Sequence, residues 1–142
     1  MTDLTADALH LILDQQPFSH LVGVRLASAE PGAVSFELDL KPEHHQQHGF
    51  AHGGVVATLA DVAISFAAGT VIGDLVTVEF KLNYLRPGLG ETLIARGQVV
   101  SSTKRQAVCR ADIFAVKDGT EKLIAAAQGT LAAVRKDATP AV

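Results

Sequence analysis

The stretch from His52 to Ala68, HGGVVATLADVAISFAA, constrains the fold more than any other part of the chain. It is almost wholly apolar, and its two glycines stand at its start rather than in its middle. The Ala and Leu content favours a helix over a strand, and the length allows about four helical turns. Apolar residues cover nearly the whole circumference, which is typical of a helix enclosed by other elements. We therefore expect a fold built around one buried helix.

Asp61 is the only charged residue in this stretch. At about 100° per residue it shares one narrow stripe of the helix with Gly54, Thr58 and Ser65. A buried carboxylate is costly unless it is paired or solvated, and no Lys or Arg lies within one helical turn of it. A purely structural role would need backbone amides or a distant arginine as partners. We favour the other interpretation, a carboxylate kept beside a cleft as a base or a nucleophile.

Composition and charge narrow the class of protein. The chain has 142 residues, enough for one domain with a sizeable core, which we expect to span 1–142. The net charge of −3 gives no indication of nucleic-acid binding. Cys109 is the only cysteine, and we expect a small core residue in a reducing compartment. The N-terminus lacks the basic residues of a signal peptide, and Asp61 interrupts the longest apolar run. We predict a cytoplasmic protein without a membrane span.

Hydrophobic periodicity divides the rest of the chain into one further helix and six strands. Apolar residues at helical spacing predict a helix over 3–15, which Pro17 ends. Alternation of apolar and polar residues predicts the strands, and Asp118-Gly119 is a hairpin signal. The predicted strands cover 21–29, 34–40, 75–85, 92–100, 105–116 and 122–134, with a polar loop over 41–51 and a frayed tail over 136–142.

The strand order predicts how the sheet and the helix combine. Runs of strands around one apolar helix indicate an α+β fold, with an antiparallel sheet of five to six strands curled around that helix. In the strand over 75–85, alternation places Val76 and Val78 on the apolar face and Thr77 on the opposite one. Pairing of two chains into a continuous sheet would cover both the sheet edges and the polar stripe of the helix around Asp61.

Two motifs resemble the hotdog-fold superfamily, and within it the PaaI-type acyl-CoA thioesterases. The first is QQHGFAHGGVVATLAD over 46–61, in which the aspartate follows the histidine of HGG by nine positions. The second is TVEFKLNYLRPG over 77–88. The resemblance covers essentially the whole chain in element order. It implies hydrolysis of acyl-CoA without a cofactor, in a homodimer or a homotetramer whose active sites lie between subunits.

The resemblance also assigns roles to individual residues. Asp61 stands where the family has its catalytic carboxylate, and Gly53 where a backbone N–H at the helix start polarises the thioester carbonyl. Thr77 matches a hydroxyl that a partner chain contributes to hold the attacking water. Gln46 is a departure, because the family often has Asn there in contact with the thioester carbonyl. Three interpretations stay open: the longer amide keeps the contact with a shifted geometry, the substrate differs, or Gln47 or His48 takes over the role.

The physical chemistry of a helix start agrees with these roles. Unpaired N–H groups at a helix N-terminus carry partial positive charge and stabilise an oxyanion. Gly54 allows a ligand to approach the backbone closely, and His52 is expected to orient the helix start by hydrogen bonding rather than to act as an acid. Asp61 shares the stripe of Gly54, so base and oxyanion donor are predicted to face one substrate. The sequence leaves open whether Asp61 is a nucleophile or a base acting on water.

Other readings of the same residues are weaker. His44, His45, His48 and His52 suggest a metal site, but glycines and a proline disfavour a helix there and no cysteine or HExxH motif supports it. We therefore predict a polar loop and no metal. Among the basic residues, the candidates for binding the phosphates of coenzyme A are Arg86, Lys104 and Arg105.

Two other functions use the same fold. A hotdog hydratase or dehydratase also needs a histidine and an acid, but the chain lacks its characteristic loop. A non-catalytic acyl-CoA-binding module has no reason to retain a costly carboxylate at position 61. Acyl-CoA hydrolysis is therefore the function that we predict, with an acyl group that the sequence does not identify.

Overall fold

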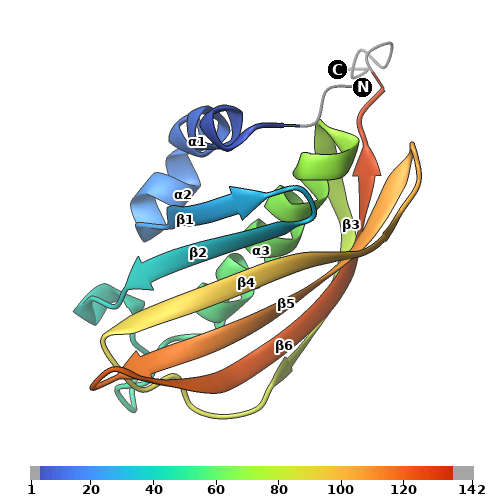
Figure 1. Cartoon of the computed structure of the whole chain (residues 1–142). Coiled ribbons are helices and arrows are strands. Elements are labelled where there is room, and N and C mark those ends of the chain that lie inside the picture. The colour runs from blue at the N-terminus through green and yellow to red at the C-terminus, as the bar shows by residue number, and fades with distance from the viewer. Residues whose placement is uncertain (1–3, 136–142) are drawn as a thin grey trace, which may run out of the picture.

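The computed structural model of the chain describes residues 4–135, in which all other elements surround one long helix (Figure 1). This helix, α3, runs from Gly53 to Ile72. Three shorter helices precede it: α1 (Ala6–Asp14), α2 (Pro17–Val22) and the 3-10 helix η1 (Pro42–His44). The strands are β1 (Arg25–Glu30), β2 (Ala33–Asp39), β3 (Leu75–Tyr84), β4 (Thr92–Ser102), β5 (Gln106–Lys117) and β6 (Thr120–Ala133).

The six strands form one sheet in the order β1-β2-β4-β5-β6-β3, and every neighbouring pair is antiparallel. The sheet curves around α3, so that the helix lies on its concave face (Figure 1). Positive φ angles at Asp118 and Gly119 form the tight turn of the β5–β6 hairpin, as the sequence predicted. The predicted α+β fold, with its sheet curled around a buried helix, is confirmed.

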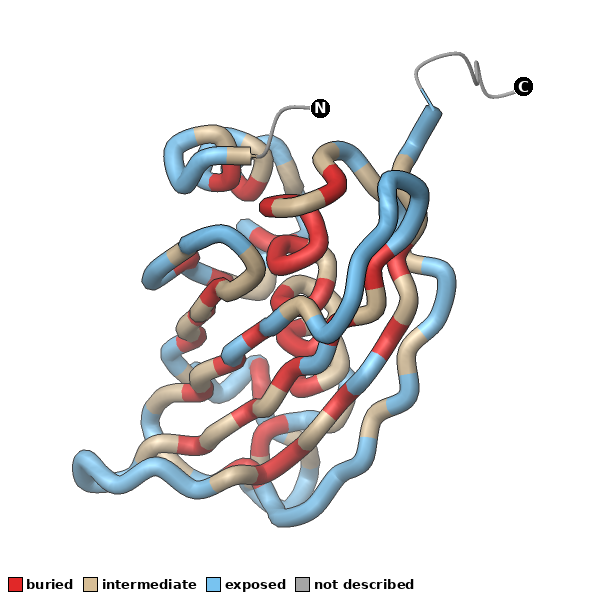
Figure 2. The backbone as a smooth tube through the Cα atoms, turned by 45° about the vertical axis from the view of Figure 1, so that its right-hand side comes forward, coloured by how far each residue is buried: buried red, intermediate tan, exposed pale blue. Residues whose placement is uncertain are grey.

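Packing against the sheet explains why α3 is apolar all round. By its length and its mean hydropathy of 2.0, α3 is the one helix within residues 4–135 that could cross a membrane. However, 67% of its most apolar 18-residue stretch is buried inside the molecule. Buried residues concentrate on α3 and on the strand faces turned toward it (Figure 2). A Cβ at Gly97 of β4 would collide with the carbonyl oxygen of Ala63, so a glycine is needed for the sheet to lie this close to the helix.

The N-terminal region differs from the prediction, because two helices precede the sheet instead of one. The first begins at Ala6, since the Thr5 side chain caps it by accepting from the Ala8 N–H at 3.2 Å. Pro17 does not only end a pattern but starts α2 at its first position, where a proline loses no helical hydrogen bond. The strand expected over 21–29 is therefore shorter and forms β1. Residue 3 and the predicted tail, 136–142, lie outside the described residues.

Strand β3 contains an irregularity that reverses the predicted faces of its first half. A β-bulge in its pairing with β6, between Thr77 and Glu79, inserts one extra residue and shifts the alternation. Val76 and Val78 are consequently 57% and 60% exposed, and the prediction that they face the core is wrong. Thr77 pairs with the buried Leu131 and points toward α3 instead. This reversal brings the Thr77 hydroxyl to the helix.

Candidate active site

The N-terminal end of α3 presents a free backbone donor. His52 is the N-cap, and its Nδ1 accepts a hydrogen bond from the Gly54 N–H at 2.8 Å. The Gly53 N–H, at the first helical position, donates to no group within residues 4–135. It lies at the positive end of the longest helix of the described chain, where N–H groups attract an oxyanion. Gly53 is thus suited to the role that the resemblance implied.

Tyr84 packs against this helix end, although the sequence did not indicate it as a site residue. Its hydroxyl donates to the Gly53 carbonyl oxygen at 2.7 Å, and a Cβ added at Gly53 would lie 3.2 Å from that hydroxyl. The end of β3 is thereby joined to the start of α3. The signal that could have found Tyr84 is its place at the start of YLRP, within the second motif of the resemblance.

Gln46 lies beside the same helix end and keeps its amide available. Its side-chain oxygen accepts from the backbone N–H groups of His48 and Phe50, which closes the loop before α3. The Nε2 group of Gln46 donates to no residue in the described part of the chain. Gln46, Gly53, Tyr84 and Arg86 line one pocket of about 340 Å³, which we call the helix-tip pocket. His48 is exposed and does not line it.

Asp61 belongs to a second group of polar side chains, two turns further along α3. Thr77 Oγ1 donates to Asp61 Oδ1 at 2.8 Å, and Ser65 Oγ donates to the same oxygen at 3.4 Å. The two hydroxyls also contact each other at 3.0 Å. Asp61 is half-buried rather than sealed in the core, and it forms no ion pair with any residue between 4 and 135. Oδ1 is therefore held by two hydroxyl groups, while Oδ2 accepts no hydrogen bond from any residue between 4 and 135.

The contact between Thr77 and Asp61 lies within one chain. The resemblance implied that the hydroxyl at position 77 comes from a partner chain. The bulge in β3 instead brings Thr77 to Asp61 of its own chain, so the two act as one unit.

The two groups of site residues are separated along the helix. Asp61 follows Gly53 by eight residues, which corresponds to about 12 Å along the axis at 1.5 Å per residue. A carbonyl that accepts from the Gly53 N–H is too far from Asp61 of the same chain for a water held by that carboxylate to attack it. Asp61 and Gly53 of the same chain are therefore too far apart to act on one carbonyl, because sharing a stripe of a helix does not make two residues neighbours.

The basic residues predicted to bind phosphate do not gather within one chain. Arg86 lines the helix-tip pocket, and its Nη1 donates to the Leu123 carbonyl oxygen at 2.9 Å. Lys104 and Arg105 lie in the β4–β5 turn, beside the end of β6, at the opposite end of the sheet (Figure 1). Of the three candidates, only Arg86 is near the helix start.

The histidines of the loop have separate environments. His44 is buried, with Nδ1 accepting from the Lys41 N–H at 2.9 Å and Nε2 donating to the Val22 carbonyl oxygen at 2.7 Å. Both ring nitrogens are thus used by the backbone, and His44 fastens the loop to α2. His45, His48 and His52 are exposed. Among residues 4–135 no three His, Cys, Asp or Glu side chains lie close enough to hold a metal ion.

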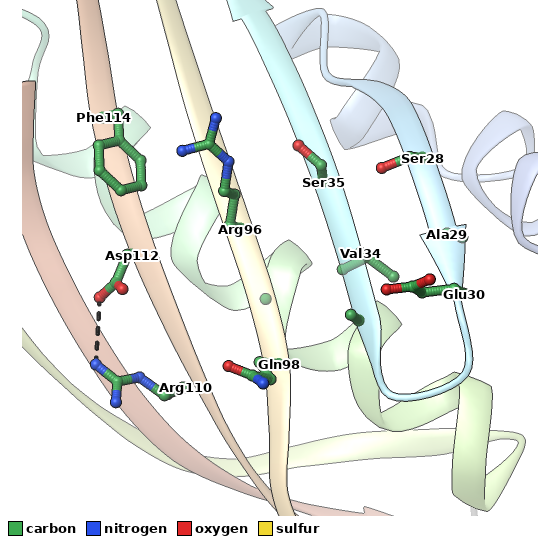
Figure 3. A pocket seen from close by; sticks show the side chains of 12 residues that line it. Ser28, Ala29, Glu30, Val34, Ser35, Arg96, Gln98, Arg110, Asp112 and Phe114 are labelled. Carbon is green, nitrogen blue, oxygen red and sulfur yellow. Dashed lines mark ion pairs between the residues drawn. The ribbon is translucent and has the colours of Figure 1, made fainter. Parts of the chain in front are cut away.

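The outer face of the sheet carries a hollow of about 510 Å³ (Figure 3). Arg96 at its rim forms two hydrogen bonds with Glu121, at 2.9 and 2.8 Å, and lies 4.7 Å from the centre of the Phe114 ring. These bonds lower the pKa of the Glu121 carboxyl and raise that of Arg96. No residue predicted for the active site lines this hollow. Arg110 and Asp112, which also line it, form an ion pair at 3.6 Å.

An antiparallel sheet curved around one central helix, with polar groups at the helix start and middle, defines a hotdog-fold protein. The sequence model of the thioesterase superfamily matches residues 48–122. The chain therefore belongs to the thioesterase superfamily, and it is a thioester hydrolase.

Similar proteins agree in fold and in family. The structure of a thioesterase family protein from Silicibacter pomeroyi is 34% identical, covers 87% of this chain and 93% of its own, and has a TM-score of 0.85. The phenylacetic acid degradation protein PaaI from Thermus thermophilus, in a mutant structure, is 31% identical with a TM-score of 0.74, over 84% of this chain and 100% of its own. Human acyl-coenzyme A thioesterase 13 is 29% identical over 92% of this chain and 94% of its own.

Proposed function

We propose that the protein hydrolyses acyl-CoA thioesters to a free acid and coenzyme A, with Asp61 as a general base. The observation that carries this proposal is the half-buried Asp61 carboxylate, one oxygen of which accepts from Thr77 at 2.8 Å. Hydroxyl donors hold the carboxylate in place without neutralising it, and the second oxygen is free to accept a proton from water. The human relative carries the name of an acyl-CoA thioesterase, which supports the choice of thioester.

In the proposed reaction, the thioester carbonyl oxygen accepts from the Gly53 N–H, with Gln46 Nε2 as a second donor. A water molecule attacks the carbonyl carbon while Asp61 takes one of its protons. The tetrahedral oxyanion is stabilised by the donors at the helix start. It collapses with cleavage of the C–S bond, the acid is released, and the thiolate leaves without needing a strong acid. The proton on Asp61 is then returned to solvent or to the thiolate, which restores the enzyme.

The separation of about 12 Å between the two groups requires that each site combine two chains. Strand β3 is an edge of the sheet, and Val76 and Val78 are exposed on it. Pairing of two β3 strands about a twofold axis would make the two α3 helices antiparallel, so that the start of one lies near the middle of the other. Gly53 and Gln46 of one chain would then face Asp61 and Thr77 of its partner. A dimer of this kind, or a tetramer made of two, is the proposed active form.

Mixing two inactive variants tests the shared site. Asp61→Asn removes the base, and Gly53→Pro removes the N–H donor; a mixed dimer has one site with both changes and one with neither. Random reassociation after denaturation should therefore restore about one quarter of wild-type activity. Restoration should depend on co-refolding, and a sizing column should show that each variant still assembles. No recovery in mixed dimers would refute a site made from two chains.

Isotope labelling distinguishes a base from a nucleophile. In a single turnover in oxygen-18 water, a base route puts the label only into the released acid. A nucleophilic route forms an anhydride at Asp61, whose hydrolysis by labelled water can place oxygen-18 in the enzyme carboxylate. We expect an unlabelled Asp61, as read by mass spectrometry of the peptide that contains it. Label in that peptide would contradict the base role while leaving the thioesterase function intact.

The acyl group is proposed to lie in the cleft beyond Asp61. Ser65, which contacts both Asp61 and Thr77, also lines a cleft of about 120 Å³ between α1, α3 and the start of β3. Its other walls are mainly apolar and include Leu9, Ile12 and Phe66. An engineered apolar cavity of about 150 Å³ is known to hold benzene, so this cleft suits one ring or a short chain. A panel of acyl-CoA substrates should show kcat/KM falling for long chains, and a preference for long chains would overturn this assignment.

A further inference from the structure

A second hollow adjoins the helix-tip pocket on the side of the β5–β6 hairpin. It has a volume of about 460 Å³ and shares Arg86, Pro87 and Ile124 with the helix-tip pocket. Its remaining walls include Lys117 and Lys122 of the hairpin. We call it the hairpin pocket. A ligand that enters the helix-tip pocket can therefore continue into the hairpin pocket without leaving the surface of one chain.

The register of the sheet places both lysines on the face that carries the active site. Alternate residues of β5 face α3 and are buried, ending with Ile113 and Ala115, and Lys117 is the next residue on this face. Lys122 of β6 pairs with Ala115 and therefore points to the same side. The side of the sheet that faces the core therefore ends in two lysines beside the start of α3, although the alternation of β5 places apolar residues on this side.

The cations of the hairpin pocket also lack carboxylate partners. Arg25, Arg96 and Arg110 each form an ion pair with an acidic side chain. By contrast, Arg86, Lys117 and Lys122 form none with any residue from 4 to 135. One acidic residue, Asp118, lines the pocket, so three positive charges face one negative charge.

Arg86 is held in place for a ligand. One nitrogen of its guanidinium donates to the Leu123 carbonyl oxygen at 2.9 Å, next to Lys122 in β6. The bond fixes the side chain against the sheet and leaves the other guanidinium N–H groups for a further acceptor. Guanidinium and ammonium groups in this arrangement suit the oxygens of phosphate.

We propose that the hairpin pocket binds the phosphate groups of the coenzyme A part of the substrate, through Lys117, Lys122 and Arg86. This proposal rests on the proposed function, and it adds two lysines of the hairpin to Arg86 as phosphate ligands. With the carbonyl at Gly53, the pantetheine arm passes Tyr84 and Pro87 to reach the cations. The competing explanation is that charged hairpin ends only keep the sheet soluble.

The test compares two substrates that share one acyl group. One is the acyl-CoA, and the other is the acyl thioester of N-acetylcysteamine, which has the thioester end but no phosphate. For Lys117→Ala/Lys122→Ala we expect KM for acyl-CoA to rise about tenfold with kcat nearly unchanged, and KM for the short thioester to stay constant. Lys117→Arg/Lys122→Arg should keep the KM of the wild type. Arg110→Ala is the matched control, because it removes a positive charge from the opposite face of β5.

Each result has a defined meaning. An unchanged KM for acyl-CoA, or an equal rise of KM for both thioesters, overturns the phosphate site while the thioesterase function stands. If the wild-type protein hydrolyses neither thioester, the proposed function fails, and calorimetry with adenosine 3′,5′-bisphosphate tests the pocket by itself. Binding that the double alanine variant loses and Arg110→Ala keeps supports the site. Binding that all variants share, or that the wild type lacks, refutes it.

Discussion

Replacement of Gly53 by proline removes one backbone N–H donor and keeps helix α3 intact. Gly53 is the first residue of α3, the position at which proline is best tolerated. The preceding residue, His52, has φ −60° and ψ 137°, which is the extended conformation that proline requires before it. The carbonyl of Gly53 still accepts from Tyr84. The substitution therefore removes only the N–H group, which donates a hydrogen bond to no residue between 4 and 135.

The size of the effect follows from the role of a single oxyanion donor. Removing one such donor costs about 2.7–4 kcal/mol in the transition state, so kcat for acyl-CoA hydrolysis should fall about 100- to 1,000-fold. Gly53→Ala is the control, because it keeps the N–H and adds a Cβ 3.2 Å from the Tyr84 hydroxyl. Release of the thiol gives kcat, and thermal melting followed by circular dichroism shows that both variants fold. If the proline and alanine variants have the same kcat, the Gly53 N–H is not the oxyanion donor.

Three further predictions concern other parts of the site and core. Thr77→Val removes the hydroxyl that holds Asp61 and should lower kcat about tenfold, since a hydrogen bond to a charged group is worth roughly 1.5–3 kcal/mol; Thr77→Ser should restore it, and a fully active valine variant would contradict the contact. His52→Ala should lower the free energy of unfolding by about 1 kcal/mol through loss of the cap on Gly54, and His52→Asn should retain it, as urea denaturation will show. Burial raises the pKa of the Cys109 thiol from 9.0 to about 11. The neutral thiol therefore stabilises the folded chain below pH 9, and this contribution is lost as the pH rises toward 11; Cys109→Ala should show a smaller fall in melting temperature over that range, and equal slopes would count against it.

The order of elements was predictable because it depends on short-range geometry. Val34, Phe36 and Leu38 alternate with polar residues and are buried in β2, as a period of two requires. The apolar run after Gly53 forms α3, since a helix without a polar face has to be enclosed. These patterns are set by residues only a few positions apart, so they are visible in a single sequence.

Two errors of the prediction have identifiable causes. The sequence predicts that Pro17 ends one helix, but the fixed φ angle of proline also suits the start of a helix, and α2 begins there. Alternation predicts the wrong face for the first half of β3, because one extra residue at the bulge moves every preceding side chain to the other side. The local pattern of apolar residues reveals neither the helix start at Pro17 nor the bulge in β3.

The local sequence was sufficient to identify the buried helix, its single carboxylate and the glycines at its start. The surroundings of these groups were set by packing between distant segments. Asp61 meets Thr77 because β3 bulges against β6, and Gln46 and Arg86 reach one pocket because the loop before α3 lies beside the end of β3. The physical reason is range: periodicity follows from backbone geometry over a few residues, whereas the neighbours of a side chain depend on strand register, which one inserted residue reverses.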